Sequence, residues 1–100
     1  MRIISRGTLR HFWEIHKDAA EPLKAWFREA SAADWANPHA VKALYGSASV
    51  TSVTGDNRIV FNVAGNKYRL IAKFNYDYQV GYVRFIGSHA EYDAISAEAI

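Results

Sequence analysis

The sequence predicts an α+β fold in which helices in the first half of the chain pack on an antiparallel sheet of three to four strands. Before residue 46, apolar side chains recur at the three- and four-residue spacing of helices. From residue 48 to residue 87, β-branched and alternating segments are separated by short turns. A short strand, "MRII", is expected to open the chain, and a short helix is expected after residue 87.

Two amphipathic helices are expected before residue 33. Their apolar stripes are Leu9, Phe12, Trp13 and His16 in the first helix, and Leu23, Trp26, Phe27 and Ala30 in the second. Thr8 is the expected cap of the first helix. Asp18, which lies three residues before Glu21, is the expected cap of the second.

The segment "NPHAVKALYG" predicts a third, shorter helix. Asn37 is a favourable cap, Pro38 suits the first helical position, and Gly46 is placed just past the expected end. This helix completes the predicted helical half of the chain.

Four strand candidates follow the helices. They are "ASVTSV", "RIVFNV", "KYRLIAKFNY" and "QVGYVRFIG", and the turns between them are "TGDN", "AGNK" and "YDYQ". In the third candidate, alternate side chains share a face. The face expected to meet the helices holds Tyr68, Leu70, Ala72, Phe74 and Tyr76, and the opposite face holds Lys67, Arg69, Ile71, Lys73 and Asn75. Three cations on that opposite face repel one another, so it is either a solvated surface or a surface that binds a polyanion.

The composition indicates one globular domain spanning residues 1–100, since half of the chain is apolar and 14% of it is aromatic. The absence of cysteine excludes disulfides and thiolate metal sites. The apolar runs fall far short of the roughly 20 residues that span a membrane, and the start has no secretory h-region, so a cytoplasmic location is expected. The net charge is +2, but residues 58–89 carry five cations against Asp77 alone. This locally basic segment favours a polyanion site on one surface.

The turn at "YDYQ" should pair the last two strand candidates as an antiparallel hairpin, which would bring Gly87, Ser88 and His89 beside Lys67 and Arg69. Ser88 followed three residues later by a glutamate predicts a capping box, so a helix should begin there. Free N–H groups at a helix start can bind an anion, and cations nearby would add to that site.

His89 and Tyr92 lie one helical turn apart in "SHAEYD". A histidine can exchange a proton near neutral pH, so His89 is a candidate for proton transfer, and Tyr92 is a candidate for orienting a group or moving a proton. A purely local hydrogen-bonding role for His89 is the alternative. The other histidines, His11, His16 and His39, have no carboxylate at metal-ligand spacing, and no metal site is expected.

Three segments resemble the HigB family of bacterial toxins, within the RelE-like superfamily. They are "MRIISRGTLRHFWE", "ADWANPHAVKALY" and "RIVFNVAGNKYRLIAKFNYDYQVGYVRFIGSHAEYD", with "FNVAGNKYRL" and "SHAEYD" the most specific parts. The resemblance covers nearly the whole chain. It implies a RelE-like α+β fold with an antiparallel sheet and no cofactor or metal requirement.

The resemblance also implies an mRNA endonuclease toxin of a type II toxin–antitoxin pair that cuts translated message on the ribosome. Its expected partners are a HigA-type helix-turn-helix antitoxin, mRNA and the ribosome, with DNA reached only through the antitoxin and no membrane. In the family pattern, the arginine of "YRL" contributes to the phosphate site, and here it is Arg69. His89 and Tyr92 match the other contributing positions approximately, and Arg58 stands where many relatives have further lysines.

The expected mechanism is attack of an RNA 2′-hydroxyl on the adjacent phosphate. Arg69 and Lys67 would stabilise the phosphate charge, His89 would transfer a proton, and Tyr92 would orient the substrate or transfer a proton. Further RNA contacts are expected from Lys73, Arg84 and Arg58. Two alternatives stay open: a toxin of the same fold that binds a protein such as gyrase, and a passive RNA-binding module.

Overall fold

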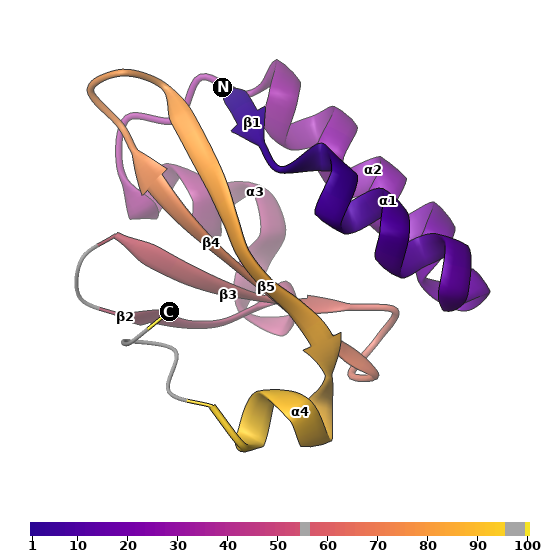
Figure 1. Ribbon diagram of the computed structural model, residues 1–100. Helices are drawn as coiled ribbons and strands as arrows, with labels where there is room; N and C mark the ends of the chain where they lie inside the picture. Colours follow the sequence, from indigo (N-terminus) through magenta and orange to yellow (C-terminus); the bar gives the residue numbers. More distant parts are fainter. Residues whose placement is uncertain (55–56, 96–99) are drawn as a thin grey trace.

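The order of the elements is the one that the sequence predicts: a strand, the helices, four consecutive strands and a last helix. Figure 1 shows their arrangement in a computed structural model that describes residues 1–54, 57–95 and 100. The elements are β1 Arg2–Ile4, α1 Arg6–Ile15, the 3-10 helix η1 Lys17–Ala19, α2 Ala20–Ala32, α3 Pro38–Ser49, β2 Val50–Thr54, β3 Arg58–Val63, β4 Tyr68–Asn75, β5 Val80–Ser88 and α4 His89–Asp93. The predicted α+β class is confirmed. The turn expected at "TGDN" includes residues 55 and 56, which lie outside the described residues.

One mixed sheet of five strands has the order β1-β5-β4-β3-β2. The pairs β2–β3, β3–β4 and β4–β5 are antiparallel, as expected. The opening strand β1 adds a fifth strand and pairs parallel with β5, with Arg2 opposite Val80. Sequence patterns did not predict this pairing, because it joins segments almost eighty residues apart and no short turn sets its register.

The helices α1, α2 and α3 cover one face of the sheet, as Figure 1 shows. The predicted apolar face of β4 is confirmed: Tyr68, Leu70, Ala72 and Phe74 are all buried in the core with residues of the helices. The helical stripes contribute Leu9, Trp13, Leu23, Trp26 and Ala30 to the same core. Burial of apolar surface on this side holds the helices to the sheet. The opposite face of β4 points away from these helices.

The helix caps agree with the sequence at α3 and α4 but not at α1 and α2. The amide of Ala40 donates to Asn37 Oδ1 at 3.0 Å, so the predicted cap of α3 is confirmed. The helix then continues past Gly46 to residue 49, where an end at Gly46 was expected. The cap of α1 is Ser5 rather than Thr8, which lies inside the first turn and donates its amide to the Ser5 carbonyl.

Asp18 caps no helix, because its carboxylate is bound to the start of β4. It accepts hydrogen bonds from the Lys67 ammonium and, at 2.8 Å, from the Tyr68 hydroxyl. The hydrogen bond from Lys67, followed by that from Tyr68, holds the pKa of the Asp18 carboxyl below its usual 3.8. The contact ties η1 to the turn before β4, across fifty positions of sequence.

Lys67 therefore does not lie on the outer face of the sheet, where the alternation of "KYRLIAKFNY" was expected to place it. It belongs to the turn before β4, and its ammonium points to Asp18 on the helical side. We use "outer face" for the side of β3 and β4 that carries Arg58, Val60, Asn62, Arg69, Ile71 and Lys73.

The Asp18 contact predicts a pH-dependent contribution to stability. Because the folded state lowers this pKa, the contribution is present above about pH 4 and is lost as pH falls through the folded-state pKa. Asp18→Asn should lower the melting temperature at pH 7 and should have little effect at pH 2.5. Thermal unfolding of both proteins across this range measures the difference, with the exposed Glu21→Gln as control. An equal difference at both pH values would contradict the assignment.

Candidate active site

Arg69 is buried on the outer face, and no described residue pairs a carboxylate with it. It is the second residue of β4, it pairs with Asn62 on one side and Gly87 on the other, and it is only 5% exposed. Within the described part of the chain, its Nε and Nη1 atoms have no hydrogen-bond partner. Its guanidinium carbon lies 5.7 Å from the centre of the Tyr92 ring. A buried cation held by an aromatic face rather than by an anion is suited to receive an anion from outside.

The antiparallel register brings the predicted residues of the last helix to this arginine. Gly87 lies opposite Arg69, Ser88 lies opposite Tyr68, and the His89 amide donates to the Lys67 carbonyl at 3.2 Å. The predicted convergence of the end of β5 with the start of β4 is therefore confirmed.

Gly87 has no space for a side chain at this point. A Cβ atom there would lie 2.6 Å from the Phe85 ring and 3.3 Å from Glu91 Oε1. The Phe85 ring therefore packs against the main chain directly opposite Arg69. This close packing leaves glycine as the residue that fits.

The predicted capping box begins α4 directly after Ser88. The Ser88 amide donates to Glu91 Oε1 at 2.9 Å, and the Glu91 amide donates to Ser88 Oγ at 3.1 Å. The hydrogen bond from the Ser88 amide, followed by one with the Ser88 side chain, holds the pKa of the Glu91 carboxyl below its ordinary value. The amides of His89 and Glu91 are both bonded within the protein, so the anion site expected at the start of α4 stays a prediction with fewer N–H groups to support it.

His89 is held by a residue that the sequence analysis missed. Its Nδ1 atom lies 3.0 Å from Asp93 Oδ2, four residues further along α4, and its side chain is 45% exposed. A carboxylate at Nδ1 favours the tautomer that leaves Nε2 as the proton acceptor. The signal was present in "HAEYD", because residues four apart meet on a helix.

The remaining predicted cations gather further along the outer face. Arg58 donates to the main-chain oxygen of Ile100 from Nη2 at 2.9 Å and from Nε at 3.3 Å, and Arg84 donates to the same oxygen from Nε at 3.2 Å. Lys73 lies opposite Arg58 in the sheet. Because Lys73 is four residues after Arg69 on β4, this second group of cations is about 13 Å away along the strand. The guanidinium groups of Arg58 and Arg84 donate to the same oxygen, which is the geometry that a phosphate oxygen would accept.

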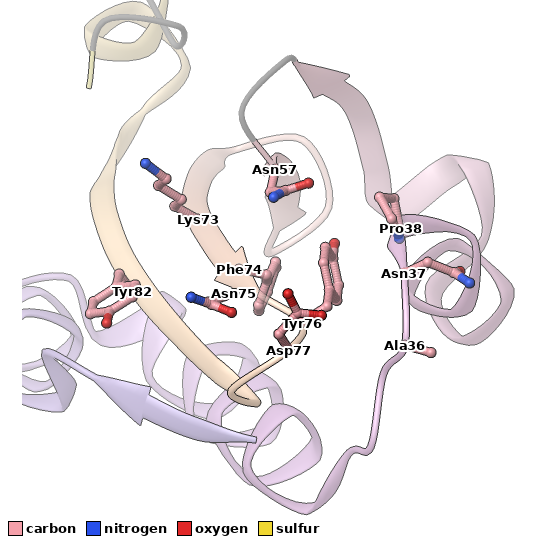
Figure 2. Close-up of a pocket in the computed structure, with 10 residues that line it drawn as sticks. All are labelled: Ala36, Asn37, Pro38, Asn57, Lys73, Phe74, Asn75, Tyr76, Asp77 and Tyr82. Carbon is pink, nitrogen blue, oxygen red and sulfur yellow. The ribbon is translucent and has the colours of Figure 1, made fainter.

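A cavity lies beyond Lys73 and is separate from Arg69, His89 and Tyr92. It has a volume of about 690 Å³ and lies at the far end of β4, bordered by Lys73, Asn75 and Asp77. Figure 2 shows it between the β4–β5 turn and the start of α3. Sequence reasoning did not find it, because its walls come from four separate segments of the chain.

Among residues 1–54, 57–95 and 100, no group of three or more His, Cys, Asp or Glu side chains could hold a metal ion. In the same ranges no helix is both long enough and apolar enough to cross a membrane.

Comparison with known proteins identifies the family. The model of the HigB toxin family, described as the RelE-like toxic component of a toxin–antitoxin system, matches residues 19–95. The chain is 28% identical over 97 residues to the mRNA interferase toxin HigB of Escherichia coli K12, a match that covers 97% of this chain and 92% of the relative. The mRNA interferases HigB of Escherichia coli O157:H7 and Shigella flexneri match to the same extent. With its RelE-like α+β fold and with Arg69, His89 and Tyr92 at one end of the sheet, the chain belongs to the HigB family of toxins.

Proposed function

We propose that this protein is an mRNA endonuclease and that Arg69 binds the phosphate that is cleaved. The observation that carries the proposal is the buried guanidinium of Arg69, which faces the Tyr92 ring and has two nitrogens without a hydrogen-bond partner among the described residues. Such a group is costly in a folded protein unless an anion completes it. The names of the relatives, which are mRNA interferases, support RNA as the source of that anion.

The reaction requires one proton to leave the attacking oxygen and one to reach the leaving oxygen. In the proposed mechanism the RNA 2′-hydroxyl attacks the adjacent phosphorus, the P–O5′ bond breaks, and the products are a 2′,3′-cyclic phosphate and a 5′-hydroxyl. His89, oriented by Asp93, takes the 2′-hydroxyl proton through Nε2. Arg69 stabilises the charge on the phosphorane oxygens. Tyr92 holds Arg69 in place and orients the nucleotide or donates the second proton.

The other cations guide the RNA rather than react with it. Arg58 and Arg84 bind a neighbouring phosphate in the position that the Ile100 oxygen occupies here, and Lys73 continues the same path. Lys67, which is ion-paired with Asp18 but still exposed, adds long-range attraction at the rim. The proposal includes no metal ion.

The proposed setting follows from the family. The substrate is mRNA bound to the ribosome in the cytoplasm, and a HigA-type helix-turn-helix antitoxin neutralises the toxin. The basic outer face suits both rRNA and mRNA, because phosphate contacts depend little on sequence.

Primer-extension mapping of mRNA ends in cells that express the protein tests this activity. Growth arrest without new mRNA ends would instead indicate a toxin that binds a protein target.

Replacing Arg69 should separate activity from stability. Arg69→Met removes the buried charge but keeps an unbranched side chain, so the melting temperature should stay the same or rise, while cleavage falls by at least a hundredfold. Purified protein, thermal unfolding and an RNA cleavage assay measure the two effects. Arg69→Lys is the matched variant, since it retains the charge without the planar fork, and its activity should be intermediate. Full activity of a folded Arg69→Met protein would refute the phosphate assignment.

His89→Gln should reduce cleavage without weakening RNA binding. Glutamine can still hydrogen-bond to Asp93 but cannot accept the proton, so the rate should fall by about 10² to 10⁴. Asp93→Asn should give a smaller loss, because it disturbs only the orientation of the imidazole. Single-turnover cleavage and RNA affinity, measured on the same variants, check both effects. Unchanged rates in both variants would support the passive RNA-binding alternative.

A further inference from the structure

The cavity at the far end of β4 lies where the outer face meets the helical side of the sheet, with Lys73 and Asn75 from the outer face and Phe74 and Tyr76 from the other. Strand β4 continues beyond its last pair with β3, Arg58 opposite Lys73, and the Phe74 amide donates to the Asn57 carbonyl. The space beyond this point is the cavity of about 690 Å³. In Figure 2, Lys73 and Tyr82 lie on one side of it and Asn37 and Pro38 on the other.

Two amides in the cavity wall are fixed in orientation. Asn75 Oδ1 accepts from the Tyr78 amide at 3.1 Å, and Asn37 Oδ1 accepts from the Ala40 amide at 3.0 Å. Because the Asn75 oxygen is committed, its NH₂ group is left to donate to a ligand, whereas the Asn37 side chain points away from the other lining residues in Figure 2. Asp77, next to the turn, is exposed and supplies a carboxylate acceptor. The wall therefore offers one fixed amide donor, from Asn75, and an anionic acceptor, Asp77.

Flat aromatic surfaces accompany these polar groups. Tyr76 lies 6.0 Å from Phe74 between ring centres, and Tyr82, opposite Lys73, is 39% exposed. Burial raises the pKa of Tyr76 to about 12, so its hydroxyl keeps its proton. Aromatic faces combined with amide and carboxylate groups are the means by which proteins bind unpaired RNA bases.

We propose that this cavity holds one unpaired base of the RNA and that it prefers guanine. The inference rests on the proposed function, since it names a specificity site for the same substrate. The Watson–Crick edge of guanine presents two adjacent N–H groups, which suit the Asp77 carboxylate, and the O6 acceptor, which suits an amide NH₂ group. Asn75 is six residues after Arg69, about 20 Å along the strand, so this base lies several nucleotides from the cleaved bond.

The test measures base preference without cleavage. Fluorescence anisotropy gives the affinity of the full chain for short 2′-O-methyl oligouridines that contain one central guanine, hypoxanthine or adenine, because these RNAs lack the attacking hydroxyl. The guanine RNA should bind about tenfold more tightly than the other two. Asp77→Asn should remove this preference. Asn75→Asp should also remove it, because the acceptor that holds the turn is kept while the NH₂ donor is lost.

Glu21→Gln is the matched control, because it changes the net charge by the same amount as Asp77→Asn on the exposed start of α2, and it should keep the guanine preference. Equal affinity for the three RNAs, or a preference that survives Asp77→Asn, would overturn the base site. That result would leave the nuclease proposal intact if Arg69→Met still abolished cleavage. A fully active Arg69→Met protein would instead overturn the nuclease proposal itself.

Discussion

The antiparallel pairing of β4 with β5 is the constraint on which the rest of the site depends. This register places Gly87 opposite Arg69 and ends β5 at Ser88, so α4 begins beside the arginine rather than elsewhere on the sheet. The capping box then fixes the direction in which α4 leaves the strand. A shift of one residue would turn Arg69 toward the apolar core, because neighbouring side chains on a strand point to opposite faces.

Among the described residues, three carboxylates are bound to groups on segments next to Arg69 in sequence or register. Asp18 is bound to Lys67 and Tyr68, Glu91 is bound to Ser88, and Asp93 is bound to His89. Each contact removes a possible internal partner for the buried guanidinium. Two nitrogens of the buried Arg69 guanidinium therefore have no hydrogen-bond partner among the described residues, which is a cost to the folded state.

Cations and polar groups extend from Arg69 to the cavity along a single face. Arg58, Arg84 and Lys73 lie between the two ends, while the other face of the same strands is occupied by the apolar core. One strand thus presents two different faces by alternation: residues that face the helices belong to the main core, and the opposite face places the cations Arg69 and Lys73 on either side of the buried Ile71.

The sequence by itself determined the class of the fold, the two faces of β4, the capping box at Ser88 and the pairing that brings the end of β5 to the start of β4. These features depend on periodicity and on turns of a few residues, which a sequence records directly. Only the tertiary structure decided that β1 pairs with β5, that Lys67 and Asp18 bind each other, that Arg69 is buried, and that a cavity forms beside Asn75. Each of these depends on contacts between segments far apart in the chain. Their free energy comes from packing and desolvation, which no local pattern of residues records.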